Sequence, residues 1–246
     1  MTIHMFGAYF GLAASYAFGP QSLSSSDNAD PNRVSDILAL LGTGLLWIYW
    51  PSFVGATETS NPATEQLCVM HTILALLGST GATFYFGPLL SHGKFDPVHV
   101  ANATLAGGVA VGSAARLPMT PAGAILLGAL AGTVSVYGYV YSSPALESAL
   151  SLYDTCGVGN LHGYPSVLGA LVSIGLVGLH SDEPFLSSSG SSQSSSMMMA
   201  QLLAILGTLT VSIVGGLVSG FIIMMMDPYK MKEEEEEYED GVWWEG

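Results

Sequence analysis

The sequence predicts an all-α protein, a bundle of about seven helices that crosses a membrane several times. Half of the 246 residues are hydrophobic, only 10% are charged and the mean hydropathy is +0.48. A soluble domain carries about 25% charged residues. All five basic and nineteen acidic residues lie outside the long apolar runs. Each run is long enough, at about 1.5 Å per residue, for a hydrocarbon core of about 30 Å.

The helix starts carry recognisable signals. An oxygen-bearing N-cap residue followed by proline, whose missing N–H is tolerated there, stands at Asn61-Pro62, Asp96-Pro97 and Thr120-Pro121. Asp154-Thr155 offers a cap for the sixth helix. The predicted spans are residues 1–18, 37–56, 67–90, 98–115, 122–143, 155–180 and 197–226.

Two regions follow from composition. Residues 1–226 form the transmembrane region, with a Ser-rich linker at 180–196, and residues 227–246 form an acidic tail. Eight of the nineteen acids fall in the last fourteen residues, a like-charge block that is typical of a solvated segment. The net charge of −14 argues against nucleic-acid binding. Glycines spaced four apart, as at 128/132 and 216/220, favour close helix packing in lipid.

The basic residues predict the orientation. Arg33, Lys94, Lys230 and Lys232 follow the first, third and seventh spans, whereas Arg116 alone follows the fourth. Because basic loops stay cytoplasmic, we expect the C-terminus in the cytoplasm.

Two histidines, His4 and His162, stand inside apolar runs. An ionisable ring at membrane depth is costly and indicates function by default. Burial keeps such a ring neutral, with one donor and one acceptor nitrogen. A pair of these rings suits a small neutral solute such as ammonia and disfavours bare cations. A ring bonded to a backbone carbonyl is the alternative. The other four histidines, 71, 92, 99 and 180, are predicted to be interfacial.

Two further residues have two interpretations each. Phe53 follows Trp47, Tyr49 and Trp50, so it belongs either to an interfacial aromatic belt or to an aromatic gate. The residues alone favour the belt. Asp96 is explained by capping, with a functional carboxylate as the alternative. No nucleophile–base pair or phosphate-binding loop predicts an enzyme, and no metal site or cofactor is expected.

Several motifs resemble one known family. These are MTIHMFGAYFGLAASY, LLWIYWPSF, NATLAGGVAVGSAA, DTCGVGNLHGYPS and YEDGVWWE. They resemble the Rhesus-glycoprotein branch of the ammonium transporter family, in register from about the fifth to the eleventh core helix. The chain thus resembles the second inverted repeat of that fold plus the last helix.

The resemblance implies a function and an assembly. It implies a multi-pass protein of the plasma membrane, a homotrimer with one ammonia-conducting pore per subunit. The twin pore histidines fall on His4 and His162 and one gate phenylalanine falls on Phe53, which reverses the preference for a belt. Asp96 matches an aspartate that begins the eighth core helix.

The chain also departs from the family pattern. Its first four core helices are absent, and with them the second gate phenylalanine and an aspartate that precedes the first pore histidine. We therefore expect a truncated chain whose function belongs to its parent. A non-conducting structural or regulatory subunit, a channel that also passes carbon dioxide, and a haem or metal protein using the two histidines are the alternatives.

Overall fold

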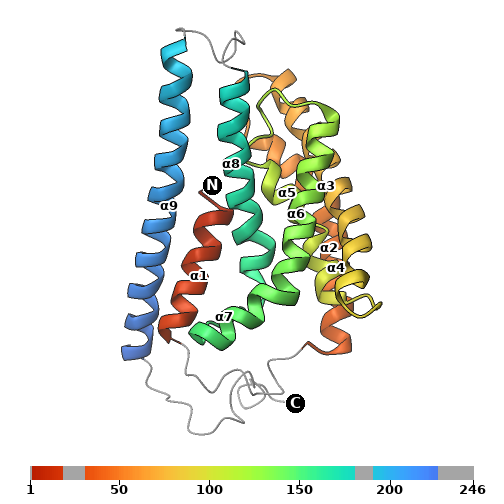
Figure 1. Cartoon of the computed structure of the whole chain (residues 1–246), viewed down its shortest axis with the longest axis vertical. Coiled ribbons are helices and arrows are strands. Elements are labelled where there is room, and N and C mark those ends of the chain that lie inside the picture. Colours follow the sequence, from red (N-terminus) through yellow and green to blue (C-terminus); the bar gives the residue numbers. More distant parts are fainter. Residues whose placement is uncertain (1, 19–30, 181–190, 227–246) are drawn as a thin grey trace, which may run out of the picture.

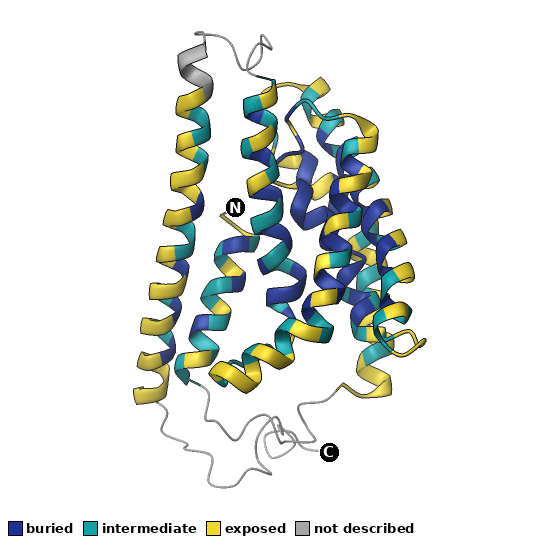
Figure 2. Ribbon diagram, in the orientation of Figure 1, coloured by how far each residue is buried: buried dark blue, intermediate teal, exposed yellow. Residues whose placement is uncertain are grey.

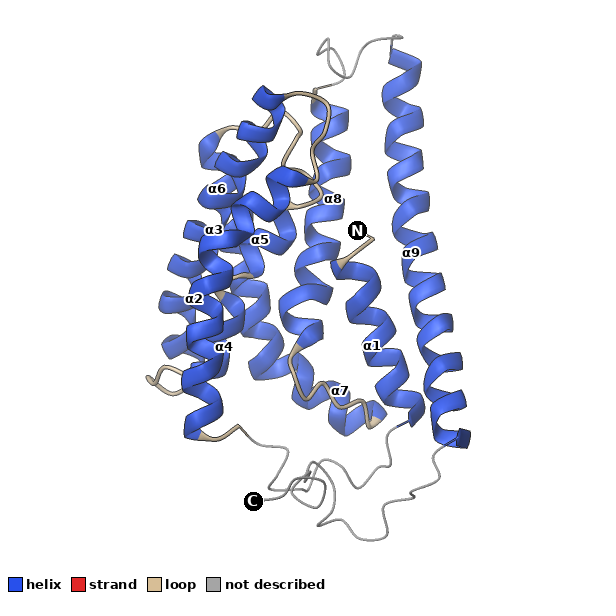
Figure 3. Cartoon of the chain, turned by 180° about the vertical axis from the view of Figure 1, so that it is seen from behind, coloured by secondary structure: helices blue, strands red, loops and turns tan. Residues whose placement is uncertain are grey.

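The computed structural model describes residues 2–18, 31–180 and 191–226, which are helical with short connections (Figure 3). The acidic tail at 227–246 lies outside the described residues. The helices are α1 His4–Phe18, α2 Arg33–Ala56, α3 Pro62–Leu90, α4 Pro97–Ala103, α5 Ala106–Val111, α6 Pro121–Tyr137, η3 Gly138–Ser142, α7 Ser143–Leu150, η4 Gly159–Gly163, α8 Tyr164–Leu179 and α9 Ser191–Met226. The elements η3 and η4 are single π-helical turns.

The Asn-Pro and Thr-Pro start signals are confirmed. Asn61 accepts a hydrogen bond from the N–H of Thr64 at 2.9 Å, and Thr120 accepts one from Gly123 at 3.1 Å. In each case proline begins the helix. Short-range chemistry therefore determines where α3 and α6 begin.

The number of helices long enough to cross a membrane is smaller than predicted. Among the described residues there are five: Arg33–Ala56, Pro62–Leu90, Pro121–Leu150, Gly159–Leu179 and Ser195–Met226. The first predicted span becomes α1, with 15 residues. The fourth, predicted at 98–115, divides into α4 and α5 at a turn through Thr104 and Leu105. Hydropathy does not reveal this turn. Protein surrounds the turn residues, so no polar residues are needed there to mark it in the sequence.

Two further predicted boundaries are wrong. The sixth helix begins at Gly159 rather than at Thr155, because residues 151–158 form a loop. The last helix begins at Ser191, inside the predicted Ser-rich linker. Serine is an adequate helix former, so its frequency alone does not end a helix.

Close helix packing depends on small residues. The α3–α6 contact brings Gly128 and Gly132 against the backbone of Ala75 and Ser79, so that a Cβ atom at either glycine would overlap that backbone. Gly216 and Gly220 of α9 lie in the same way against α1, around Ala14. The spacing of four thus marks two real interfaces, and α9 and α1 run side by side (Figure 1).

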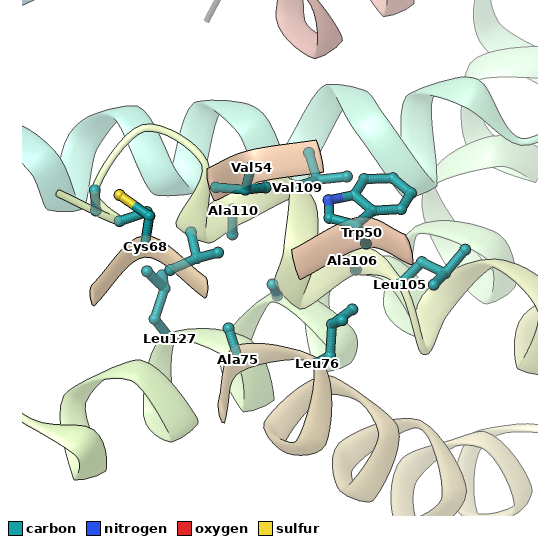
Figure 4. Packing of buried hydrophobic residues seen from close by; sticks show 14 of the residues in the cluster. Trp50, Val54, Cys68, Ala75, Leu76, Leu105, Ala106, Val109, Ala110 and Leu127 are labelled. Atoms are coloured by element: carbon teal, nitrogen blue, oxygen red, sulfur yellow. The ribbon is translucent and has the colours of Figure 1, made fainter. Parts of the chain in front are cut away.

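The core lies between α2, α3, α5 and α6. Its cluster contains Trp50, Ala75, Leu76 and Leu127 together with Ala106, Val109, Ala110 and Val111 of α5 (Figure 4), and all six residues of that helix are buried. The outer faces of α2 and α9 are exposed and apolar (Figure 2). A protein with an apolar outside and an equally apolar core is suited to lipid rather than water.

Candidate functional site

The structure brings His4 and His162 together from two segments that are far apart in the sequence. His4 is the first residue of α1, and His162 lies in the π-helical turn η4. Their ring centroids are 4.9 Å apart and the ring planes are 3° from parallel. A π turn holds one extra residue, which rotates the side chains that follow by about 100° relative to an α-helix, and such turns are common at functional sites.

One ring nitrogen of the pair is available. The Nδ1 atom of His162 is buried and has no hydrogen-bond partner among the described residues. A buried, unpaired polar atom costs about 1–3 kcal/mol. This excludes, for that atom, the alternative of a ring bonded to a carbonyl, and it leaves a nitrogen able to bind a small polar solute.

Trp50 is a site residue that the sequence interpretation did not single out. Its side chain is 6% exposed, so it does not belong to an interfacial belt. The indole lies parallel to both imidazoles within 16°, with its centroid 5.5 Å from that of His4 and 6.3 Å from that of His162. The signal was present: Trp47, Trp50 and Val54 follow an i, i+3, i+7 spacing, and all three face the core.

Phe53 lies at the edge of this group. Its ring centroid is 6.4 Å from His4 and 6.3 Å from Trp50, each in an edge-to-face arrangement. The side chain is 44% exposed. Phe53 is thus partly exposed and in contact with both His4 and Trp50.

Comparisons with known proteins identify the family of the chain. The model of the Ammonium Transporter Family matches residues 1–242. The chain belongs to the ammonium transporter family. Ammonium transporter Rh type B of Xenopus tropicalis is 43% identical over 256 residues, and that of Homo sapiens is 40% identical over 257 residues. Both alignments cover 100% of this chain and 55–56% of the relative, so the chain spans about half the length of these relatives.

One solved structure has the same fold as this chain. It is that of Nitrosomonas europaea Rh50, described in connection with conduction by the Rhesus protein family of channels. The TM-score is 0.81 at 35% identity, over 99% of this chain and 58% of the other. The all-helical, membrane-spanning fold of the Rhesus branch is thereby shown, and the family is one of transporters.

Asp154 holds the turn that carries His162. Its two carboxylate oxygens each accept a hydrogen bond at 2.8 Å, from the N–H groups of Val158 and Gly159. Burial raises the pKa of the Asp154 carboxyl, and these N–H donors oppose the shift. Asp154 was predicted to cap a helix that begins at Thr155. Its carboxylate instead binds the N–H groups of the residues four and five positions later in the chain.

We expect Asp154→Ala to disturb η4. Two partly buried N–H groups lose their acceptor, which costs up to about 1–3 kcal/mol each, so the melting temperature should fall by several degrees. Asp154→Asn keeps one oxygen acceptor and should lose less. Thermal unfolding followed by circular dichroism in detergent compares the three proteins. Equal melting temperatures would contradict the role given to Asp154.

Asp96 forms the N-cap of α4. Its Oδ1 atom accepts hydrogen bonds from the N–H groups of Val98 at 2.8 Å and His99 at 3.4 Å, and its Oδ2 atom is 4.0 Å from the His99 ring. Capping accounts for the hydrogen bonds that the carboxylate makes.

Asp96 variants separate the cap from a functional carboxylate. Asp96→Ala should lower stability by about 1 kcal/mol, whereas Asp96→Asn, also a good N-cap, should not. The free energy of unfolding and the ammonium flux are measured for both. If Asp96→Asn is stable but transports less ammonium, the charge has a function beyond the cap.

Two histidines predicted to be interfacial are buried instead. His71 is fully buried in α3, with Nδ1 2.8 Å from the carbonyl oxygen of Ala115 and Nε2 3.0 Å from that of Met119. His99 is 8% exposed and lies 5.0 Å from the Tyr139 ring. His71 shares the inward stripe of Ala75 and Ser79, so its spacing was the missed signal. Among the described residues, no group of three His, Cys, Asp or Glu could hold a metal ion.

Proposed function

We propose that this chain belongs to a channel that conducts ammonia, NH3, across a membrane. The observation that carries the proposal is the close, parallel arrangement of His4 and His162 inside an apolar bundle of the ammonium transporter family. Its Rh type B relatives are named as ammonium transporters, and the Rh50 structure is described in connection with conduction by channels. The His pair is the polar element at the centre of the proposed passage.

The chemistry of two neutral imidazoles supports ammonia rather than a cation. Each ring presents one donor and one acceptor, and NH3 offers both kinds of partner. The rings that contact the pair among the described residues are those of Trp50 and Phe53, which carry no charge, so a desolvated cation gains no countercharge from these neighbours and would lose several kcal/mol. Ammonium reaches the neutral form by releasing a proton, whereas Na⁺ and K⁺ have no neutral form.

Phe53 is proposed as part of the gate. Its exposed π face attracts an ammonium ion at the mouth, and its edge-to-face contact with His4 places the next binding partner 6.4 Å away by ring centroid. The ion gives its proton to water at the mouth, beside the exposed Phe53 side chain, and NH3 alone moves on to His4.

The assembly and location extend this proposal. The start of α2, the connection from α3 to α4 and the end of α9 lie at one end of the bundle (Figure 1), and the basic residues predict that this end is cytoplasmic. We place the chain in the plasma membrane as a homotrimer with residues 227–246 as a cytoplasmic tail. The exposed apolar surfaces of α2 and α9 are available for lipid and for neighbouring subunits.

Vesicle flux tests the proposal. The purified protein is reconstituted into liposomes that contain a pH-sensitive dye, and an ammonium salt is added outside them. Entry of NH3 should raise the internal pH faster than in empty liposomes, and a potassium gradient should produce no protein-dependent signal. Equal rates with and without protein, alongside normal folding, would favour the non-conducting structural subunit instead. A carbon dioxide gradient across the same vesicles tests the alternative that the channel also passes carbon dioxide.

A further inference from the structure

We propose that Gly108 of α5 sets the size of amine that the His4–His162 pair admits, acting through the indole of Trp50. This inference rests on the proposed function. Gly108 has no side chain and does not contact the permeant in the proposed mechanism, so it is a positioning residue. Its effect comes from the space that it leaves for Trp50.

Gly108 is in close contact with the edge of the indole. A Cβ atom at Gly108 would lie 2.7 Å from Nε1 and 2.9 Å from Cδ1 of Trp50, and 3.1 Å from Cδ2 of Leu76. Carbon atoms make favourable contact at about 3.5–4.0 Å, so one of these groups has to move when a methyl group is added. Leu76 is fully buried in the same cluster and has little room to do so.

The indole is the group free to move, because packing alone holds it. Its Nε1 atom is buried without a hydrogen-bond partner among the described residues, in contrast to Trp47, whose Nε1 donates to Thr80 at 3.1 Å. No hydrogen bond therefore resists a displacement of Trp50. The ring contacts on its other sides are those with His4, His162 and Phe53.

A methyl group added at position 108 should therefore reduce the free space beside the two histidine rings. Trp50 is displaced from α5 by an added methyl group, and the space it enters is shared with the histidine rings. Conversely, a smaller ring at position 50 releases volume next to them. The two changes should act in opposite directions on a permeant larger than ammonia.

The experiment compares methylamine with ammonia. Gly108→Ala should lower the ratio of methylammonium to ammonium flux in liposomes by about 10-fold, the discrimination that one methylene supports in a tight apolar site, and Trp50→Phe should raise it. Gly81→Ala is the matched control, because a Cβ at Gly81 has no atom within 4 Å. A merely structural role would reduce both fluxes together and leave the ratio unchanged.

A spectroscopic readout tests the link to the pair. The ¹⁵N resonances of the His4 ring should shift in Gly108→Ala and stay in place in Gly81→Ala. Normal wild-type flux with unchanged ratios in both site variants overturns this inference alone. A wild-type protein that moves neither amine overturns the proposed function and this inference with it. If Gly108→Ala does not fold, the ratio in Trp50→Phe decides.

Discussion

Replacing His162 with leucine is expected to reduce ammonium-driven alkalinisation of liposomes by at least about 10-fold. The substitution removes the buried Nδ1 atom, which has no hydrogen-bond partner among the described residues and is available to a solute. Loss of one hydrogen-bonding partner in a dry site costs about 1–3 kcal/mol, and 1.4 kcal/mol corresponds to a factor of ten. Stopped-flow fluorescence of an internal pH dye measures the rate.

The control for this prediction is His180→Leu, which makes the same chemical change at the end of α8. His180 Nδ1 is 3.1 Å from the carbonyl oxygen of Leu176 at the C-terminal end of α8, about 27 Å along the helix from His162 at about 1.5 Å per residue. Its flux should remain near that of the wild type. Because His4 and His162 act on one solute, the double variant should lose less than the product of the two single losses. Unchanged flux in His162→Leu would remove the histidine mechanism.

Gly128→Leu is expected to produce a large loss of stability. A Cβ atom there would overlap the carbonyl group of Ala75 in the facing helix α3. Backbone cannot yield as a flexible side chain does, so α3 and α6 have to separate. Overpacking of a core costs about 1–3 kcal/mol and occasionally more, and we expect a value at or above the upper end.

Thermal unfolding of the protein in detergent, followed by circular dichroism, tests this prediction. Gly81→Leu is the matched variant, since Gly81 is exposed and a Cβ there has no atom within 4 Å. It should melt close to the wild type. Similar melting temperatures for Gly128→Leu and the wild type would show that α3 and α6 do not pack as closely as described.

The packing face of a helix was only partly predictable from the sequence. The spacing of Trp47, Trp50 and Val54 shows that the three share a face, but it does not say whether that face meets protein or lipid, because both are apolar. The partner settles this: Trp50 lies between α5 and the His4 ring. For the same reason the sequence did not predict the burial of His71. The structure shows it, because the ring nitrogens lie next to the carbonyl oxygens of Ala115 and Met119.

The sequence by itself determined the properties that depend on neighbouring residues and on composition. These are the apolar runs, the caps at Asn61 and Thr120, and the singling out of His4 and His162 as ionisable rings in uncharged surroundings. Only the tertiary structure decided which rings meet, where the fourth span turns and what surrounds Trp50. Capping and hydrophobicity act over a few residues, whereas the meeting of residues 4, 50, 108 and 162 requires four segments to pack at once. Such long-range packing is fixed by the shape of the whole bundle rather than by any local stretch of chain.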